Sequence, residues 1–254
     1  MMGRTGVEYL SDPTFFAEKE AVYLRVRGLE GRLLSDEQVT RLPFIPPSPH
    51  AQEWRWRSRS FQRFRRFLLK KHGERPLRIL DLGCGNGWMA NRLAEQQQWD
   101  IWAVDLNAAE LAQGARCFIR PNLRFVYADV MAGVLPQDYF DAVVLAAAAQ
   151  YFPNLTALCA MLRKSLTSNG EIHVLDTHFY PNETAKAVAR QRTADYYARL
   201  GVPEMTDFYH HHLLSEANAW GAKNLNDHWR TWWLQKTKWL APFPWMTAEC
   251  FTKI

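Results

Sequence analysis

One stretch, residues 78–90 (RILDLGCGNGWMA), constrains the fold of this chain more than any other. Its first half has the apolar pattern of a short buried strand, and its middle holds glycines at positions 83, 85 and 87. Glycines let the backbone turn sharply and leave no side chain over the turn, so that a ligand can lie directly on the main chain. The free N–H groups of a following helix favour a carboxylate or a phosphate there. The stretch predicts a strand, a ligand-binding turn and a helix.

The spacing of these glycines excludes two common phosphate-binding loops. A dinucleotide-binding loop reads G-x-G-x-x-G, but here Trp88 stands in place of the last glycine, where an indole would obstruct the pyrophosphate. A P-loop needs Gly-Lys-Ser/Thr, which does not follow. Residues 81–87 (DLGCGNG) instead resemble the first motif of class I S-adenosylmethionine-dependent methyltransferases. That cofactor has a carboxylate, an ammonium, a ribose and an adenine, but no phosphate.

The next hundred residues alternate between the patterns of strands and helices, which implies right-handed crossovers and a parallel sheet. After the opening strand, the expected strands are residues 101–105, 123–128, 140–146 and 171–176, and the expected helices are 88–97, 108–117 and 155–166. We read the tail as two closing strands, one within 230–236 and one within 245–253. The expected fold is a doubly wound α/β fold with a mostly parallel seven-stranded sheet, an antiparallel C-terminal strand and an N-terminal helical cap.

Three parts of the chain follow from this pattern. Residues 1–75 are expected to form a helical cap and a basic helix, and residues 76–180 the Rossmann-like, cofactor-binding core. Residues 181–254 are expected to supply a substrate-facing helix and loop, with helix 183–200, and the closing hairpin. The aromatic side chains of the cap and the loop 200–220 would close the pocket.

The basic helix, residues 51–71, has one apolar stripe that contains Trp54, Phe61, Phe64 and Leu68, while its other faces carry arginines and lysines. A solvated helix face explains these charges, and a patch for an anionic substrate or a nucleic acid is the alternative. The aromatic residues fill the apolar stripe instead of interleaving with the charges, which weakens the case for nucleic acid.

Polar residues stand where three predicted strands end. The glycine turn ends the first strand, Asp105 the second and Asp129 the third. In a doubly wound sheet, ligands bind outside the carboxyl ends of the strands. An aspartate after a strand also often caps the following helix. All three features in this order favour a nucleoside-binding site, in which one carboxylate accepts the ribose hydroxyls and the other the adenine amino group.

The resemblance to class I methyltransferases, which covers residues 76–180 best, implies a role for each matching position. Gly83, Cys84 and Gly85 would contact the methionine and ribose, and Asp81 would orient the turn and, through water, the ammonium. Asp105 would bind the ribose. The remaining implied contacts are Leu106 beside the adenine, Asp129 at its amino group, the Val130 N–H at a ring nitrogen and Ala146 near the methionine.

Methyl transfer is an in-line displacement, and the sulfonium methyl is already electrophilic. The protein therefore mainly positions the acceptor, and a base is needed only where the acceptor must lose a proton. The candidates for that role follow the fourth and fifth strands, and we single out His178 and Tyr151 as catalytic, with a pocket-lining role as the alternative. The other candidates are Gln150, Asp176 and Tyr180.

Composition sets broad limits on partners and surroundings. The net charge of +5 permits an anionic partner without requiring one, and the four cysteines form no C-x-x-C pair, so that no metal site or disulfide framework is expected. We expect a cytoplasmic protein without a signal peptide or transmembrane segment. Six of the 11 tryptophans lie between residues 220 and 245. We expect them in the closing hairpin, with Trp233 buried, and in subunit contact as a homodimer; an interfacial surface near a lipid-linked acceptor is the alternative.

Three functions remain open from the sequence. The first is an S-adenosylmethionine-dependent methyltransferase that acts on a small-molecule, sugar or lipid-linked acceptor. The second is a catalytically silent protein of the same fold that binds RNA or a protein partner. The third is a nucleotide-dependent oxidoreductase, which Trp88 disfavours. Residues 149–152 (AQYF) stand where related enzymes that methylate nucleobase amino groups carry N-P-P-Y or D-P-P-Y, so that methylation of a base is disfavoured.

Overall fold

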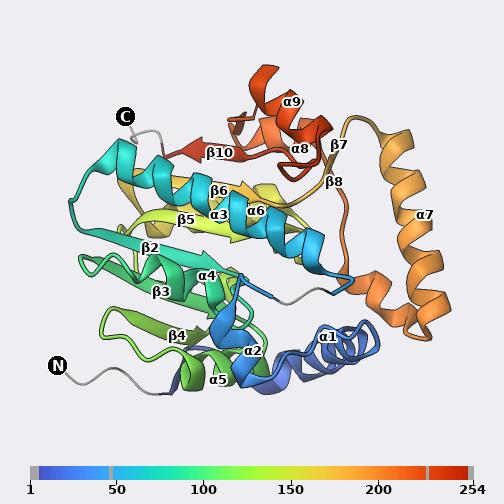
Figure 1. Cartoon of the computed structure of the whole chain (residues 1–254), viewed down its shortest axis with the longest axis horizontal. Coiled ribbons are helices and arrows are strands. Elements are labelled where there is room, and N and C mark those ends of the chain that lie inside the picture. Colours follow the sequence, from blue (N-terminus) through green and yellow to red (C-terminus); the bar gives the residue numbers. More distant parts are fainter. Residues whose placement is uncertain (1–5, 46–47, 227–228, 251–254) are drawn as a thin grey trace.

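The computed structural model describes residues 6–45, 48–226 and 229–250, without the side chains of Trp229, Arg230 and Trp232. In these residues an eight-stranded sheet has helices on both faces (Figure 1). The strand order is β1-β4-β3-β2-β5-β6-β10-β9, so that β3 and β4 follow on one side of β2 and β5 and β6 on the other, as expected for a doubly wound sheet.

Five parallel strands form the middle of the sheet, and the predicted mostly parallel sheet with an antiparallel C-terminal strand is confirmed. In the described residues this sheet has eight strands where seven were expected, because two short edge strands carry no clear sequence signal and the strand expected within residues 230–236 is absent. The parallel strands are β2 (Leu77–Leu82), β3 (Trp99–Asp105), β4 (Leu123–Tyr127), β5 (Phe140–Ala146) and β6 (Leu166–Leu175). The edges are β1 (Val7–Tyr9), parallel to β4, and β10 (Met246–Glu249) and β9 (Lys223–Asn224), both antiparallel.

Alternate residues of β2 point into two separate cores. Ile79 packs into the core under α3, α4 and α5, and Leu80 into the core under α6. Because helices cover both faces, the central strands are apolar almost throughout instead of alternating with polar residues. The bounding helices are α3 (Ala51–His72), α4 (Trp88–Leu93), α5 (Ala108–Cys117) and α6 (Leu155–Ser165).

The predicted helix over residues 51–71 is confirmed as α3, and its expected stripe of Trp54, Phe61, Phe64 and Leu68 is buried. The helices before it are α1 (Ala17–Leu29) and α2 (Asp36–Arg41), with the short 3₁₀ turn η1 (Pro13–Phe16) ahead of α1. Asp12 caps η1, and Ser35 caps α2 in a capping box. The N-terminal part is therefore helical, as expected, apart from β1.

The tail differs from the sequence prediction. A strand was expected within residues 230–236, but residues 229–236 form the helix α9 (Trp229–Lys236), and Trp233, expected to be buried, is 58% exposed. The tryptophans at positions 229, 232 and 233 and the lysine at 236 are three or four residues apart, a spacing that also fits the period of a helix. The second predicted closing strand is confirmed in β10, although residues 251–253 lie outside the described residues.

The parallel strands point their carboxyl ends toward α1, which lies across that edge of the sheet (Figure 1). The remaining helices are α7 (Glu183–Leu200) and α8 (Leu214–Ala219). The chain also has the 3₁₀ turns η3 (Ala149–Tyr151), which follows β5, and η4 (Pro203–Phe208), which follows α7. A two-stranded sheet, β7 (Phe179–Tyr180) with β8 (His212–Leu213), tethers α7. Within the part of the chain that the structure describes, we find no helix that combines the length and hydropathy needed to cross a bilayer.

Candidate functional site

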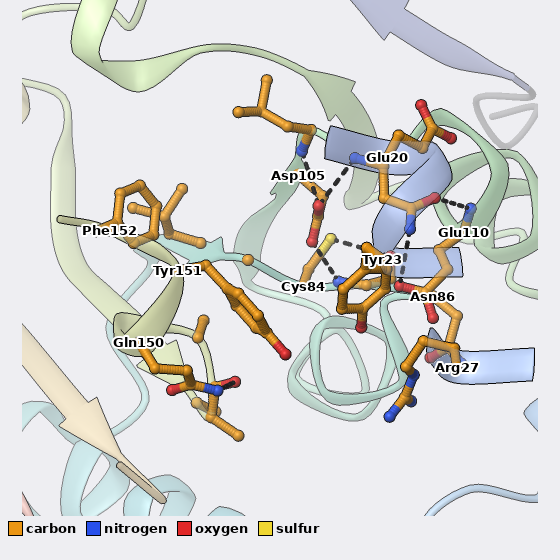
Figure 2. Close-up of a pocket in the computed structure, with 18 of the residues that line it drawn as sticks. Glu20, Tyr23, Arg27, Cys84, Asn86, Asp105, Glu110, Gln150, Tyr151 and Phe152 are labelled. Atoms are coloured by element: carbon orange, nitrogen blue, oxygen red, sulfur yellow. Dashed lines mark hydrogen bonds between the residues drawn. The ribbon is translucent and has the colours of Figure 1, made fainter. Parts of the chain in front are cut away.

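A cavity lies at the carboxyl ends of β2 to β5, and it contains the three strand-end features that the sequence singled out. The glycine turn Gly83–Gly85, Asp105 and Asp129 all line it. We call these residues the cavity floor. Figure 2 shows Asp105 and Cys84 on one side of this space and Tyr151 on the other.

The glycine turn is fixed by main-chain hydrogen bonds and close packing. The N–H groups of Gly83 and Cys84 donate to the carbonyl oxygen of Val104, at 2.8 and 3.2 Å. Gly83 has a φ of 72°, which L side chains rarely adopt, and a Cβ there would lie 2.5 Å from the Cβ of Ala148. Only glycine fits this position, so that the turn stays bare toward the cavity.

Asp105 connects the end of β3 to the glycine turn. Its carboxylate accepts hydrogen bonds from the N–H groups of Gly85 (2.7 Å), Leu106 (2.7 Å) and Asn107 (2.9 Å). Burial raises the pKa of Asp105, while these three donors act in the opposite direction. The carboxylate is thus held in one orientation at the edge of the cavity, with Leu106 beside it.

Asp129 both caps a turn and lines the cavity. Its Oδ1 accepts from the N–H of Met131 at 3.0 Å, which caps η2 (Val130–Ala132). Its own N–H donates to Oγ of Ser11 at 2.9 Å, and so the N-terminal segment is joined to the end of β4. The capping role and the place in the cavity, which the sequence posed as alternatives, occur together.

Side chains from distant segments cover the floor, and we call them the cavity roof. They come from α1 (Lys19, Glu20, Tyr23, Arg27), α3 (Trp54, Arg57), η3 (Gln150, Tyr151) and η4 (Met205, Phe208). The rings of Tyr23 and Tyr151 meet edge to face at 5.6 Å, and Nζ of Lys19 donates to the carbonyl oxygen of Tyr151 at 3.3 Å. The cap and the loop 200–220 therefore both contribute to the cavity.

Most roof residues were missed by sequence reasoning. Lys19, Tyr23 and Arg27 are spaced by four residues, which places them on one face of α1. This spacing was the only sequence pattern that could have indicated them. Glu110, in the first turn of α5, was missed as well. Burial raises its pKa to about 7, although Arg27 and Arg57 oppose that shift.

Comparison with known proteins agrees with this geometry. Residues 79–170 match a family model described as a methyltransferase domain. An uncharacterized methyltransferase of Mycobacterium bovis is 34% identical over 97 residues, which cover 38% of this chain and 49% of the relative. A malonyl-[acyl-carrier protein] O-methyltransferase of Halalkalibacterium halodurans is 32% identical over 102 residues, 38% of each chain. The chain spans about half or less of the length of these curated relatives.

Two solved structures share the fold over most of the chain. An S-adenosylmethionine-dependent methyltransferase from Mesorhizobium loti has a TM-score of 0.52 at 20% identity, covering 78% of this chain and 97% of its own. The geranyl diphosphate C-methyltransferase of Streptomyces coelicolor, solved with S-adenosyl-L-homocysteine, has a TM-score of 0.52 at 13% identity over 82% of this chain and 83% of its own. These likenesses give the described residues the fold of the class I S-adenosylmethionine-dependent methyltransferase superfamily, and the match to a methyltransferase domain covers residues 79–170.

The residues present fit the cofactor of this superfamily. Asp81 is 2% exposed beneath the glycine turn, and its Oδ2 has no hydrogen-bond partner among the described residues. Burial, with Asp105 close by, raises the pKa of Asp81 to about 7. A cation at the turn would complete this buried carboxyl, and the ammonium of S-adenosylmethionine is such a cation. Asp81 does not itself line the cavity.

The structure brings two of the five candidates for acid–base chemistry to the cavity. Tyr151 and Gln150 line it, whereas Asp176, His178 and Tyr180 are not among its lining residues. The His178 ring packs against Tyr180 at 4.4 Å and Phe243 at 6.0 Å between ring centroids. Asp176 accepts from Oγ of Ser60 at 2.6 Å.

Burial raises the pKa of the Tyr151 phenol, so that its hydroxyl stays protonated at neutral pH. This phenol is suited to donate a hydrogen bond instead of removing a proton. Leu106, Val130 and Ala146, the other implied cofactor contacts, line the cavity. In the described part of the chain, no group of three or more His, Cys, Asp or Glu side chains is arranged to hold a metal ion.

Proposed function

We propose that this protein transfers the sulfonium methyl group of S-adenosylmethionine to a small-molecule, sugar or lipid-linked acceptor held between the cavity floor and roof. The observation that carries the proposal is that the bare glycine turn, Asp105 and Asp129 meet in one cavity that continues beneath α1. A sulfonium nucleoside offers a ribose and an adenine to two such carboxylates, and it needs open main chain beside them.

The floor residues would divide the cofactor between them. Gly83, Cys84 and Gly85 would contact the methionine and the ribose, with Asp81 behind the turn. Asp105 would accept the ribose hydroxyls, and Leu106 would flank the adenine. On the remaining side, Asp129 would hold the adenine amino group, Val130 would donate its N–H to the ring, and Ala146 would lie near the methionine.

The cofactor supplies an electrophilic methyl group, and the chain supplies position. Holding two reactants in line is worth on the order of 7–11 kcal/mol of barrier. The Tyr151 ring meets the Tyr23 ring edge to face in the roof, and its protonated hydroxyl would orient the acceptor. His178 has no part in this proposal, because it does not line the cavity.

The three parts of the chain would have distinct duties. Residues 1–75 would form the cap, 76–180 would bind the cofactor, and 181–254 would complete the acceptor side through Met205 and Phe208. The alternative of a silent RNA-binding protein has less support, since part of the basic face of α3 is engaged within the molecule. Arg59 lies over the Trp239 ring at 4.4 Å, and Arg63 over Trp245 at 5.5 Å.

The test has two stages. Isothermal titration with S-adenosylhomocysteine measures whether the cofactor site exists. Incubation with methyl-labelled S-adenosylmethionine and fractionated small-molecule extracts then shows whether label enters an acceptor. We expect binding and transfer. Absence of heat with S-adenosylhomocysteine would overturn the proposal, and binding without transfer to any fraction would favour the silent protein.

A further inference from the structure

A second cavity adjoins the first, and the two share a wall. Arg27, Leu34, Trp54 and Arg57 line both cavities. The second cavity is formed by α1, α2, α3 and the segments between them, and it includes apolar side chains from Leu34, Phe44 and Ile45. The side chains of this wall, Arg27 among them, therefore border both cavities.

The second cavity is rich in cations, and most of them are paired. Glu53 pairs with Arg57 and with Arg32, each at 2.7 Å. Arg41 pairs with Glu37 at 2.6 Å. These pairs are internal to the cap, so that they leave little net charge for a ligand.

Arg27 is the exception. Among the described residues, no carboxylate lies within ion-pair distance of its guanidinium, and its Nε is buried without a hydrogen-bond partner. Its guanidinium carbon lies 5.7 Å from the centre of the Tyr23 ring. Two acids, Glu110 in the first cavity and Glu30, act on Arg27 without pairing with it. Since the pKa of Glu110 is raised to about 7, the compensation from Glu110 is partial near neutrality.

We propose that the acceptor carries an anionic group, a carboxylate or a phosphate ester, that binds Arg27, and that its apolar part lies in the second cavity. This inference rests on the proposed methyl transfer. A planar guanidinium donates to carboxylate and phosphate oxygens in pairs, and one with no carboxylate at ion-pair distance gains most from such a ligand. Leu34, Phe44 and Ile45 then contact the apolar part.

The probe is hexyl phosphate, with 1-hexanol as its uncharged counterpart, titrated into protein saturated with S-adenosylhomocysteine. We expect hexyl phosphate to bind at least about tenfold more tightly than hexanol, as a charge-assisted hydrogen bond predicts. Arg27→Met keeps the apolar stem, and it should lower the hexyl phosphate affinity by about tenfold or more. Arg25→Met is the matched control, because Arg25 lies on the same helix but is exposed and paired with Glu204 at 3.1 Å.

The carboxylate of the cofactor is the other anion within reach, and the titrations distinguish it. If Arg27→Met weakens S-adenosylhomocysteine but not 5′-methylthioadenosine, which lacks the amino-acid carboxylate, Arg27 serves the cofactor and the inference is overturned. Equal binding of hexyl phosphate and hexanol overturns it as well, and so does an equal loss in Arg25→Met. Arg27→Gln replaces the methionine variant if that variant does not fold.

Failure of the proposed function is a separate result. If S-adenosylhomocysteine does not bind the wild-type protein, the methyl-transfer proposal falls. The hexyl phosphate and hexanol titrations of the unloaded protein then still decide whether Arg27 is an anion site.

Discussion

The floor and the roof of the cavity are built in different ways. Floor residues follow directly after strands, and main-chain hydrogen bonds fix them, as Asp105 is fixed by Gly85, Leu106 and Asn107. Roof residues come from segments far apart in sequence and meet through rings and charges, as Tyr23 meets Tyr151. A floor of this kind cannot change without disturbing the sheet, whereas a roof can. Under the proposed function, the floor would hold the cofactor and the roof would select the acceptor.

The largest effect is expected at the turn. Gly83→Ala and Gly201→Ala both place alanine at positive φ, 72° and 75°, at a cost of about 1–3 kcal/mol each. At Gly83 the new Cβ also meets Ala148 at 2.5 Å, which adds about 1–3 kcal/mol of overpacking, whereas nothing lies within 4 Å at Gly201. Thermal unfolding and titration with S-adenosylhomocysteine should show a larger fall in Tm, and loss of binding, for Gly83→Ala only. Equal effects would contradict the close packing of the floor.

The next largest effect is expected when a floor carboxylate is replaced, compared with a carboxylate outside the cavity. Asp105→Asn removes the charge that would accept the ribose hydroxyls, and the Kd for S-adenosylhomocysteine should rise by about 10- to 100-fold. Asp195→Asn is the control, because Asp195 lies on α7 and accepts only a hydrogen bond from Gln191 at 2.9 Å among the contacts described. Calorimetry of both variants measures the difference. A change of less than threefold in the Kd of Asp105→Asn would mean that the floor does not bind the cofactor.

A substitution in the roof is expected to change the rate of methyl transfer and not the affinity for the cofactor. Tyr151→Phe keeps the ring against Tyr23 and removes the hydroxyl, and kcat should fall about tenfold while the Kd for S-adenosylhomocysteine is unchanged. Tyr196→Phe is matched to it, since this hydroxyl donates to Glu30 at 2.6 Å, away from the cavity. Steady-state rates with the acceptor found above provide the measurement. A loss of cofactor affinity in Tyr151→Phe, with kcat unaffected, would reverse the assignment of roof and floor.

The floor could be predicted from the sequence because strand, turn and helix are local. The sequence of residues 78–90 predicts the glycine turn. The helix over 108–117 and the strand over 140–146 have the expected bounds. Short strands and contacts between distant segments could not be predicted in this way. The three-residue strand Val7–Tyr9 exists only because it pairs with β4, and no periodicity marks it.

Two further expectations, one about a site residue and one about a strand, also depended on contacts between distant segments. His178 was singled out for the ordinary pKa of imidazole, but chemistry alone does not say where a ring points, and this ring packs on Tyr180. The strand expected over 230–236 rested on a period of two, although the same residues also fit the helical period that α9 adopts. In both cases the outcome depends on packing partners that the local sequence does not specify.

The smallest effect is a pH dependence within the floor. Burial raises the pKa of Asp81 to about 7 from its ordinary value of 3.8, so that the folded state holds this proton over a pH range in which the unfolded state has lost it. The stability that Asp81 contributes is therefore complete below about pH 4 and is lost as the pH rises through about 7. Asp81→Asn keeps the shape and an acceptor for the Ala90 N–H, but does not titrate.

The Tm difference between Asp81→Asn and wild type should therefore grow in favour of the variant by a few degrees between pH 5 and pH 8. Direct comparison with wild type is needed, because buried histidines such as His173 and His212, whose pKa values are lowered, change stability in the opposite direction below pH 6.5. Scanning calorimetry across this range measures the difference. Asp100→Asn is the control, because Asp100 is only half-buried and accepts from the Tyr139 hydroxyl at 2.9 Å at the far end of β3. A difference that stays constant with pH would mean that Asp81 is ionised in the folded protein, held by a cation at the turn even without cofactor.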